Sequence, residues 1–194
     1  MIAEQLKKYT IILGSASPRR KELLSDIGLD FSIQTTDREE EYPPKLKEKE
    51  IAEFLAKQKS SYLSENLKNT DLLITADTIV SFAGELLNKP KDMKQAKETL
   101  TKLSGNTHKV ITGVCIKTLQ KEVVFSTTTL VTFNKITEEE ITHYINNYNP
   151  FDKAGAYGIQ DWIGKIGINN IEGSYSNVVG LPTSELYEQL KSFI

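Results

Sequence analysis

One stretch near the start of the chain constrains the fold more than any other. Residues 11–13 are apolar, residues 14–17 are small, and Pro18 is followed by Arg19 and Arg20. This order predicts a buried strand, a close-approach turn and a helix with a serine N-cap and proline at its first position. The free N–H groups and the positive end of the helix dipole would then favour an anion such as phosphate. The local alternative is an ordinary helix start with two solvated arginines.

Length and charge narrow the class of protein. The chain has 194 residues, enough to enclose a cleft, and we expect a single domain over residues 1–194. The net charge of −2 and the pI near 5.8 argue against a dedicated nucleic-acid binder. No apolar run approaches the ~18 residues of a membrane span, and residues 1–10 lack a signal-peptide pattern. We therefore expect a cytoplasmic location and no stable association with nucleic acid or membrane.

The cysteine and histidine contents limit the chemistry. Cys115 is the single cysteine, and its place in the strand-like run 110–116 predicts a buried apolar side chain in preference to a nucleophile. His108 and His143 are the two histidines, which excludes a histidine-rich zinc site. Any metal would then be held by carboxylates, which favours Mg²⁺ or Mn²⁺.

Apolar periodicity predicts helices and strands in mixed order along the chain. Helices are expected from residue 18 to 28, around residues 51–62, from 92 to 105, around 141–145 and from 182 onward. Strands are expected at residues 11–13, 31–34, 72–74, 78–82, 85–87, 110–119 and 123–133, with a solvated loop at 37–50. The predicted class is α/β or α+β, with a mixed twisted sheet flanked by helices.

Polar clusters stand at the ends of the predicted strands, where α/β proteins usually bind ligands. Asp77 follows the apolar run 72–74 and could bind a metal or accept a proton, although an N-cap or turn aspartate fits about as well. The segment 88–92, which contains Lys89 and a second lysine, offers charge for phosphate. A plain helix-capping turn is the alternative for that segment.

A further cluster covers residues 152–160. Its two glycines and alanine pair permit close approach of a ligand, and Lys153 could carry phosphate charge. Tyr157 offers a stacking ring and Gln160 an amide that can read a base edge. A loop of this composition without function is the alternative.

Taken in order, these clusters match a known family. The matching segments are Ser-Ala-Ser-Pro-Arg-Arg at 15–20 with Glu-Leu-Leu at 22–24, Ala-Asp-Thr-Ile-Val at 76–80, Lys-Pro-Lys-Asp at 89–92, Leu-Ser-Gly-Asn-Thr-His at 103–108, Thr-Gly-Val at 112–114, Asp-Lys-Ala-Gly-Ala-Tyr-Gly-Ile-Gln at 152–160, and the segment from Gly-Ser-Tyr at 173–175 through Gly-Leu-Pro at 180–182. Over nearly its whole length the chain resembles the Maf family of nucleotide pyrophosphatases. The resemblance implies a Maf/ITPase-like fold with two lobes around a central nucleotide-binding cleft.

The resemblance also implies a reaction. It is the metal-assisted hydrolysis of a nucleoside triphosphate between its α and β phosphates, which gives the monophosphate and pyrophosphate. The motif at residues 155–160 is similar to that of the branch acting on dTTP and UTP, as opposed to the branch that prefers a methylated guanosine triphosphate. Modified pyrimidine nucleotides could fit the same amide, and the family's implied role is to keep non-standard nucleotides out of nucleic acids.

Residue roles follow from the same resemblance. Asp77 matches the proposed proton acceptor and a metal ligand, and Glu40 is the second candidate ligand, with a solvated charge run as its alternative. The residues expected to hold the triphosphate are Ser15 with its turn, Arg19, Arg20, Lys59, Lys89 and Lys153. The positions tied to base preference are Arg19, Thr78 and Gln160. The cofactor expected is Mg²⁺ or Mn²⁺.

Two other interpretations remain open on the sequence. One is a regulatory inhibitor of septum formation that acts through a partner without catalysis, because the family is also connected with arrest of cell division. The other is a nucleic-acid-binding module that uses the same cationic turn, against which the overall acidity and the lack of interleaved aromatics argue. A homodimer is compatible with the sequence, which does not locate its interface.

The chain departs from the family pattern at three places. Thr75 replaces a common glycine before Ala-Asp-Thr, which is expected to tighten the turn that presents Asp77. Asn149 stands where many members have glutamate before the proline, so any help which that glutamate gives to metal binding is missing here. Trp162 lies in a segment that differs from the commoner glycine-rich continuation, and we expect it to anchor a core or an interface.

Overall fold

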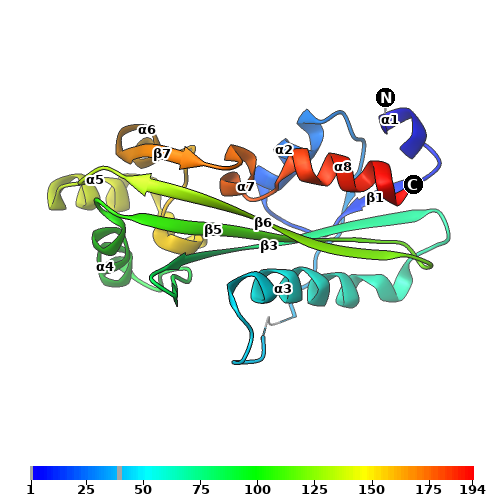
Figure 1. The fold of residues 1–194 in the computed structure, drawn as a ribbon, viewed down its shortest axis with the longest axis horizontal. Coiled ribbons are helices and arrows are strands. Elements are labelled where there is room, and N and C mark those ends of the chain that lie inside the picture. Colours follow the sequence, from blue (N-terminus) through cyan, green and yellow to red (C-terminus); the bar gives the residue numbers. More distant parts are fainter. Residues whose placement is uncertain (1, 39–40) are drawn as a thin grey trace. The chain divides into compact units, whose positions relative to one another are not determined.

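The computed structural model describes residues 2–38 and 41–194 (Figure 1). The described residues form a seven-stranded mixed sheet in the order β2-β1-β3-β5-β6-β7, with β4 paired to β3, and helices flank the sheet. The fold is therefore α/β, as the sequence predicts. The chain divides into two compact units, of which the first comprises Met1–Asp77, Thr112–Thr127 and Gly180–Ile194, and the second Thr78–Ile111 and Thr128–Val179.

The first unit holds the start of the chain and its last helix. Its complete elements are α1 (Ile2–Leu6), β1 (Thr10–Leu13), α2 (Pro18–Asp26), β2 (Ser32–Ile33), α3 (Glu48–Leu63), a 3₁₀ turn (Ser64–Asn66) and α8 (Thr183–Phe193). Three strands pass from one unit into the other, namely β3 (Asp71–Phe82), β5 (Thr107–Lys117) and β6 (Glu122–Phe133). Strand β1 pairs in parallel with both β2 and β3.

Alternating side chains give the first unit two apolar faces. Leu13 and Ile74, which are neighbours in register, belong to the cluster that also contains the buried residues of α1, α2 and α8. Ile12 and Leu73, the preceding register pair, belong to a separate cluster with Leu63 of α3. This period of two is the signature of strands covered on both sides. Figure 1 shows α3 on one side of these strands and α2 with α8 on the other.

Small residues let α3 approach the sheet closely. A Cβ on Gly113 of β5 would lie 2.1 Å from the carbonyl oxygen of Ala52, so only glycine fits there. Ala52 and Ala56 of α3 are both fully buried. The backbone of α3 therefore rests directly on β5, which fixes where the polar side chains of the helix emerge.

The second unit holds the remaining elements. They are β4 (Glu85–Leu86), α4 (Met93–Leu103), α5 (Glu138–Tyr148), 3₁₀ turns at Pro150–Asp152 and Ala154–Ala156, α6 (Trp162–Gly167), β7 (Ile168–Glu172) and α7 (Tyr175–Val179). Helix α4 contacts α5, and α5 contacts α6. Strands β4 and β7 pair antiparallel with β3 and β6. The expected hairpin turn forms at Ala83 and Gly84, both with positive φ (49° and 84°).

The structure differs from the sequence-based expectations in a few elements. Residues 71–82 form the single strand β3, where two strands separated by a polar break were expected. Helix α3 begins at Glu48, inside the expected loop, and α1 and β7 were not expected at all. Cys115 is fully buried, as predicted, and burial raises the pKa of its thiol. Among the described residues, no helix has the length and apolar character needed to span a membrane.

Candidate active site

The turn before α2 forms as the sequence predicts. Ser17 caps α2, its side chain accepting the Arg20 N–H at 3.4 Å, and Pro18 occupies the first helical position. Ser15 is only 9% exposed, and its Oγ accepts the Ser17 N–H at 3.3 Å. The serines thus brace the turn, and the positive end of the α2 dipole lies directly behind it.

Arg20 is held in place by the same turn and by a distant segment. Its Nη1 donates to Ser15 Oγ at 3.3 Å, and its Nε donates to the carbonyl oxygen of Gly180 at 2.8 Å. Gly180 has a φ of 131°, which favours glycine. These bonds join the first and the last of the sequence motifs within one unit, and they fix the orientation of the Arg20 guanidinium.

The structure also brings Lys59 and Asp77 together. Lys59 Nζ of α3 donates to Asp77 Oδ1 of β3 at 2.5 Å. The side chains are 15% and 14% exposed, so the ion pair is largely desolvated and partly accessible. Charges in such a position interact more strongly than exposed ones. Asp77 lies inside β3, and the expectation that it follows the end of a strand is therefore wrong.

Thr75 explains why the strand continues to Asp77. Thr75 is fully buried, and its Oγ1 donates to the carbonyl oxygen of Ala56 on α3 at 2.7 Å. The polar residue is therefore satisfied inside the sheet, and there is no turn for it to tighten, contrary to expectation. Its methyl group fills the space beside Gly14, where an added Cβ would lie 2.5 Å from Thr75 Cγ2.

The second unit carries Thr78, Lys89, Lys153 and Gln160. Thr78 is half-buried on β3, while Lys89 and Gln160 are exposed. The segment 152–161, which we call the base loop, contains the last two of the four. Its Gly155 N–H donates to the carbonyl oxygen of Leu87 at 2.8 Å, which lies two residues before Lys89.

Gly155 also lets the base loop approach β3 closely. Its φ is 72°, and an added Cβ would lie 3.0 Å from Val80 Cγ1. Ala156 follows with a φ of 59° while fully buried, a conformation that costs about 1 kcal/mol or more in a non-glycine residue. The loop backbone is therefore determined by its packing and not by local preference.

His108 of β5 and Tyr157 of the base loop form a buried polar contact. His108 Nε2 and Tyr157 Oη are 2.8 Å apart, and both rings contact Phe133. The two side chains are only 2% and 6% exposed. Burial lowers the pKa of His108 to about 4, so the imidazole is neutral at pH 7. Tyr157 is thus a buried anchor of the loop, and the predicted stacking ring does not face solvent.

Among residues 2–38 and 41–194, no three His, Cys, Asp or Glu side chains gather where they could hold a metal ion. Glu40, the second predicted ligand, lies outside the described residues. Asp77 alone is consistent with Mg²⁺, which typically binds one or two carboxylates together with substrate phosphates and water.

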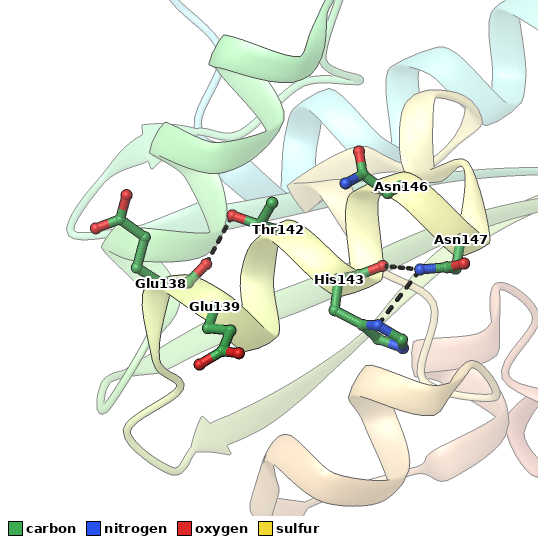
Figure 2. A pocket seen from close by; sticks show the side chains of 6 residues that line it. All are labelled: Glu138, Glu139, Thr142, His143, Asn146 and Asn147. Carbon is green, nitrogen blue, oxygen red and sulfur yellow. Dashed lines mark hydrogen bonds between the residues drawn. The ribbon is translucent and has the colours of Figure 1, made fainter.

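A surface hollow on α5 lies apart from these residues in the sequence. Figure 2 shows its six lining side chains, all from one helix, namely Glu138, Glu139, Thr142, His143, Asn146 and Asn147. Thr142 Oγ1 donates to the Glu138 carbonyl oxygen at 2.8 Å, and Asn147 Nδ2 donates to that of His143 at 2.7 Å. None of the predicted site residues lines it.

Comparisons with known proteins agree with these motifs. The family described as Maf-like protein matches residues 10–193. The chain belongs to the Maf family. A dTTP/UTP pyrophosphatase of Flavobacterium johnsoniae is 47% identical over 194 residues and covers 100% of both chains. A dTTP/UTP pyrophosphatase of Phocaeicola vulgatus is 50% identical over 189 residues, 97% of this chain and 98% of its own length.

A solved structure shares less with the chain. It is a nucleoside-triphosphatase / dITP/XTP pyrophosphatase from Mycobacterium abscessus, 14% identical, with a TM-score of 0.41 over 66% of this chain and 74% of that chain. This likeness is too slight to bear on the site. The Maf relatives, in contrast, extend over the whole chain, so every motif of the Maf family member described above lies within the matched region.

Two residues important for the geometry of the base loop were missed as site residues. His108 ends one of the matching motifs and Tyr144 has the spacing of a core residue, but neither was assigned a role. The His108 imidazole contacts Tyr157, which lies 49 residues further along the chain. The Tyr144 hydroxyl likewise contacts Gly158 and Asp161 of the base loop. Only the motif membership of His108 could have signalled this in the sequence.

Proposed function

We propose that this Maf family member is a nucleoside triphosphate pyrophosphatase that hydrolyses dTTP and UTP to the monophosphate and pyrophosphate. The observation that carries the proposal is the Lys59–Asp77 pair, a cation and a carboxylate in direct contact within a family whose curated relatives are named dTTP/UTP pyrophosphatases. That name belongs to proteins about half identical to this one over their full lengths, which favours an enzyme over the regulatory interpretation.

The cationic side chains would hold the triphosphate. Hydrolysis of a phosphoanhydride depends mainly on positioning and on neutralising charge. Arg20, braced against Ser15, presents a fixed guanidinium. The Lys59 ammonium has three N–H donors, so it can contact a phosphate oxygen while it keeps its bond to Asp77. Lys89 and Lys153, which belong to the second unit, are also proposed to contribute charge for substrate phosphates. Arg19 would contribute at the start of α2.

Asp77 would act as the proton acceptor for the attacking water. The carboxylate is 14% exposed, so water can reach it, and Lys59 holds one of its oxygens in a fixed position. The proton passes from water to Asp77 as the new P–O bond forms at the α phosphate and the bond to the bridging oxygen breaks. Pyrophosphate is the leaving group, and protonation at the bridging oxygen is not needed when its charge is neutralised.

A divalent cation fits this arrangement through Asp77 and the substrate. When bound, it would supply charge neutralisation and lower the pKa of the attacking water. Glu40 remains the second proposed ligand. The Asp77 carboxylate already accepts from Lys59, so a cation held there would share that carboxylate with the lysine.

Base preference would come from the second unit and from Arg19. The exposed Gln160 amide can donate to and accept from a pyrimidine edge, and Thr78 offers a hydroxyl. A base that cannot make the two hydrogen bonds to this amide would lose about 1 to 3 kcal/mol of binding, at about 0.5 to 1.5 kcal/mol for each bond. We also propose a cytoplasmic location, where nucleoside triphosphates are made, and no requirement for nucleic acid or membrane.

The test is pyrophosphate release from a panel of eight ribo- and deoxyribonucleoside triphosphates, each with Mg²⁺, with Mn²⁺ and with excess EDTA. We expect release from dTTP and UTP with a cation and none with EDTA. Release from purine nucleotides only would overturn the base assignment. No release from any nucleotide with either cation would overturn the enzyme itself.

A further inference from the structure

The hydroxyl group of Tyr144 forms hydrogen bonds with both ends of the turn that carries Gln160. Residues 158–161 form a tight turn closed by the Asp161 N–H, which donates to the carbonyl oxygen of Gly158 at 3.1 Å. Tyr144 Oη accepts the Gly158 N–H at 3.1 Å and donates to Asp161 Oδ2 at 2.6 Å. Gln160 is the third residue of this turn and is exposed. Its position therefore depends on a bond made by a side chain of another element.

Tyr144 is well placed to act as a fixed reference point. It lies on α5, it is fully buried, and its ring stacks on Tyr148 at 5.4 Å. Burial, together with the adjacent Asp161, raises its pKa, so the phenol keeps its proton and remains a donor. A buried phenol with two partners has little rotational freedom, and it transmits the position of α5 to the turn.

The Tyr144 hydroxyl also binds the carboxylate that lies next to Lys153. Asp161 Oδ2, which accepts from Tyr144, lies 3.8 Å from Lys153 Nζ. Lys153 also pairs with Asp152 at 2.7 Å, and its side chain is 13% exposed. A Cβ on Gly158 would lie 2.6 Å from Asp161 Oδ2 and 3.0 Å from Lys153 Cε. Because Gly158 has no side chain, Asp161 and Lys153 can approach each other beside it.

We propose that Tyr144 is a positioning residue for nucleotide recognition, because its hydroxyl holds both ends of the turn 158–161 and thereby sets where Gln160 and Lys153 meet the substrate. This inference rests on the proposed function. It adds a residue that touches neither the base nor the phosphates, and whose effect is on discrimination between bases. The chemical step at Asp77 does not depend on it.

The test compares Tyr144→Phe with Tyr148→Phe. The control residue lies one turn further along α5, is 38% exposed and loses the same hydroxyl group. For Tyr144→Phe we expect the preference for dTTP over dCTP in kcat/KM to fall about 3- to 10-fold, the fold-change of one lost hydrogen bond. The change should lie in KM, with kcat within about 2-fold, and Tyr148→Phe should match the wild type.

Substitutions at Asp161 test the same hydrogen bond if Tyr144→Phe does not fold. Asp161→Asn keeps an oxygen that can accept from Tyr144, whereas Asp161→Ala removes it, and the side chain is 24% exposed, so both changes are tolerable. We expect Asp161→Ala to lose discrimination and Asp161→Asn to retain it within about 2-fold. Amide hydrogen exchange at Gly158 should be faster in Tyr144→Phe and unchanged in Tyr148→Phe.

The outcomes separate this inference from the proposed function. An active wild type whose discrimination is the same in Tyr144→Phe and Tyr148→Phe overturns the inference alone. Equal losses in Asp161→Ala and Asp161→Asn also overturn it, because charge and not the hydrogen bond would then be responsible. A wild type that cleaves no nucleoside triphosphate overturns the proposed function and the inference together.

Discussion

The two units of the molecule hold their candidate residues in different ways. In the first unit the charged side chains are held directly, Lys59 by Asp77 and Arg20 by Ser15 and the Gly180 carbonyl. In the second unit the exposed Gln160 is held indirectly, through the backbone of the base loop. Groups expected to do chemistry are thus fixed by an ion pair or by hydrogen bonds of their own side chains. The group expected to read the base is fixed through its backbone, by the buried hydroxyl of Tyr144.

The largest effect should come from breaking the ion pair of the first unit. Asp77→Asn keeps an acceptor for Lys59 but removes the proton acceptor, so we expect kcat for dTTP to fall about 100- to 10 000-fold. The measurement is steady-state pyrophosphate release. Glu85→Gln is the matched control, since it removes a carboxylate that pairs with Lys102 at 2.9 Å in an exposed place. Equal activity of the two variants would remove Asp77 from the mechanism.

Buried His108, which contacts Tyr157 of the base loop, should make the free energy of unfolding depend on pH. Burial lowers the pKa of His108 from 6.5 to about 4, so the unfolded chain binds more protons than the folded one between these values. The contribution of His108 is present above pH 6.5 and is lost as the pH falls to 4, about 3 kcal/mol in total.

Urea unfolding at pH 7.5 and at pH 4 measures that contribution. His108→Gln should be less stable than the wild type at pH 7.5, and the difference between them should shrink by about 3 kcal/mol at pH 4. His143→Gln, a change at an exposed histidine on α5, should follow the wild type at both values. A constant difference between wild type and His108→Gln would mean that His108 is not buried in its neutral form.

A substitution at Gln160 tests whether this residue of the second unit affects base preference without affecting the chemical step. Gln160→Ala should reduce the preference for dTTP over dCTP about 10-fold, within the 1 to 3 kcal/mol expected for two lost hydrogen bonds, and leave kcat for dTTP within about 3-fold. The measurement is kcat/KM for both nucleotides. Gln120→Ala, at the tight turn between β5 and β6, is the control. A uniform loss of activity toward both nucleotides would place Gln160 in the chemistry of the reaction.

The smallest effect concerns the packing that supports Asp77. Gly14→Ala should destabilise the protein by about 1 to 3 kcal/mol, because the new Cβ meets Thr75 Cγ2 and Leu63 Cδ1. Thr75→Ser removes that methyl group and keeps the hydroxyl that donates to Ala56. We therefore expect Gly14→Ala to cost less in the Thr75→Ser background, as measured by urea unfolding of all four proteins. An unchanged cost would mean that Leu63 alone is responsible.

Local patterns in the sequence predicted the elements that depend on local signals. The N-cap and proline of α2, the turn at residues 83 and 84, and the burial of Cys115 all follow from single residues and their neighbours. The continuity of β3 could not be predicted, because Thr75 and Asp77 are satisfied by α3, more than 15 residues earlier in the chain. A polar residue with a distant partner looks like the end of a strand.

The same limit applies to the candidate site. The family resemblance implied Lys59, Asp77 and Arg20 as site residues. The contact of Lys59 with Asp77 and those of Arg20 with Ser15 and Gly180 emerged only in three dimensions. The base loop was predicted from its composition, but its support was not. Tyr144 has the helical spacing of an ordinary core residue, and nothing in the sequence distinguishes its hydroxyl from that of Tyr148 on the same helix.

The most direct test of the central claim is to identify the products formed from dTTP and from UTP by the wild-type protein with Mg²⁺. We expect dTMP or UMP together with one equivalent of pyrophosphate and no free phosphate, since water attacks at the α phosphate. Formation of the nucleoside diphosphate and free phosphate would show cleavage at the other anhydride bond, and it would contradict the pyrophosphatase assignment even if the protein proved active.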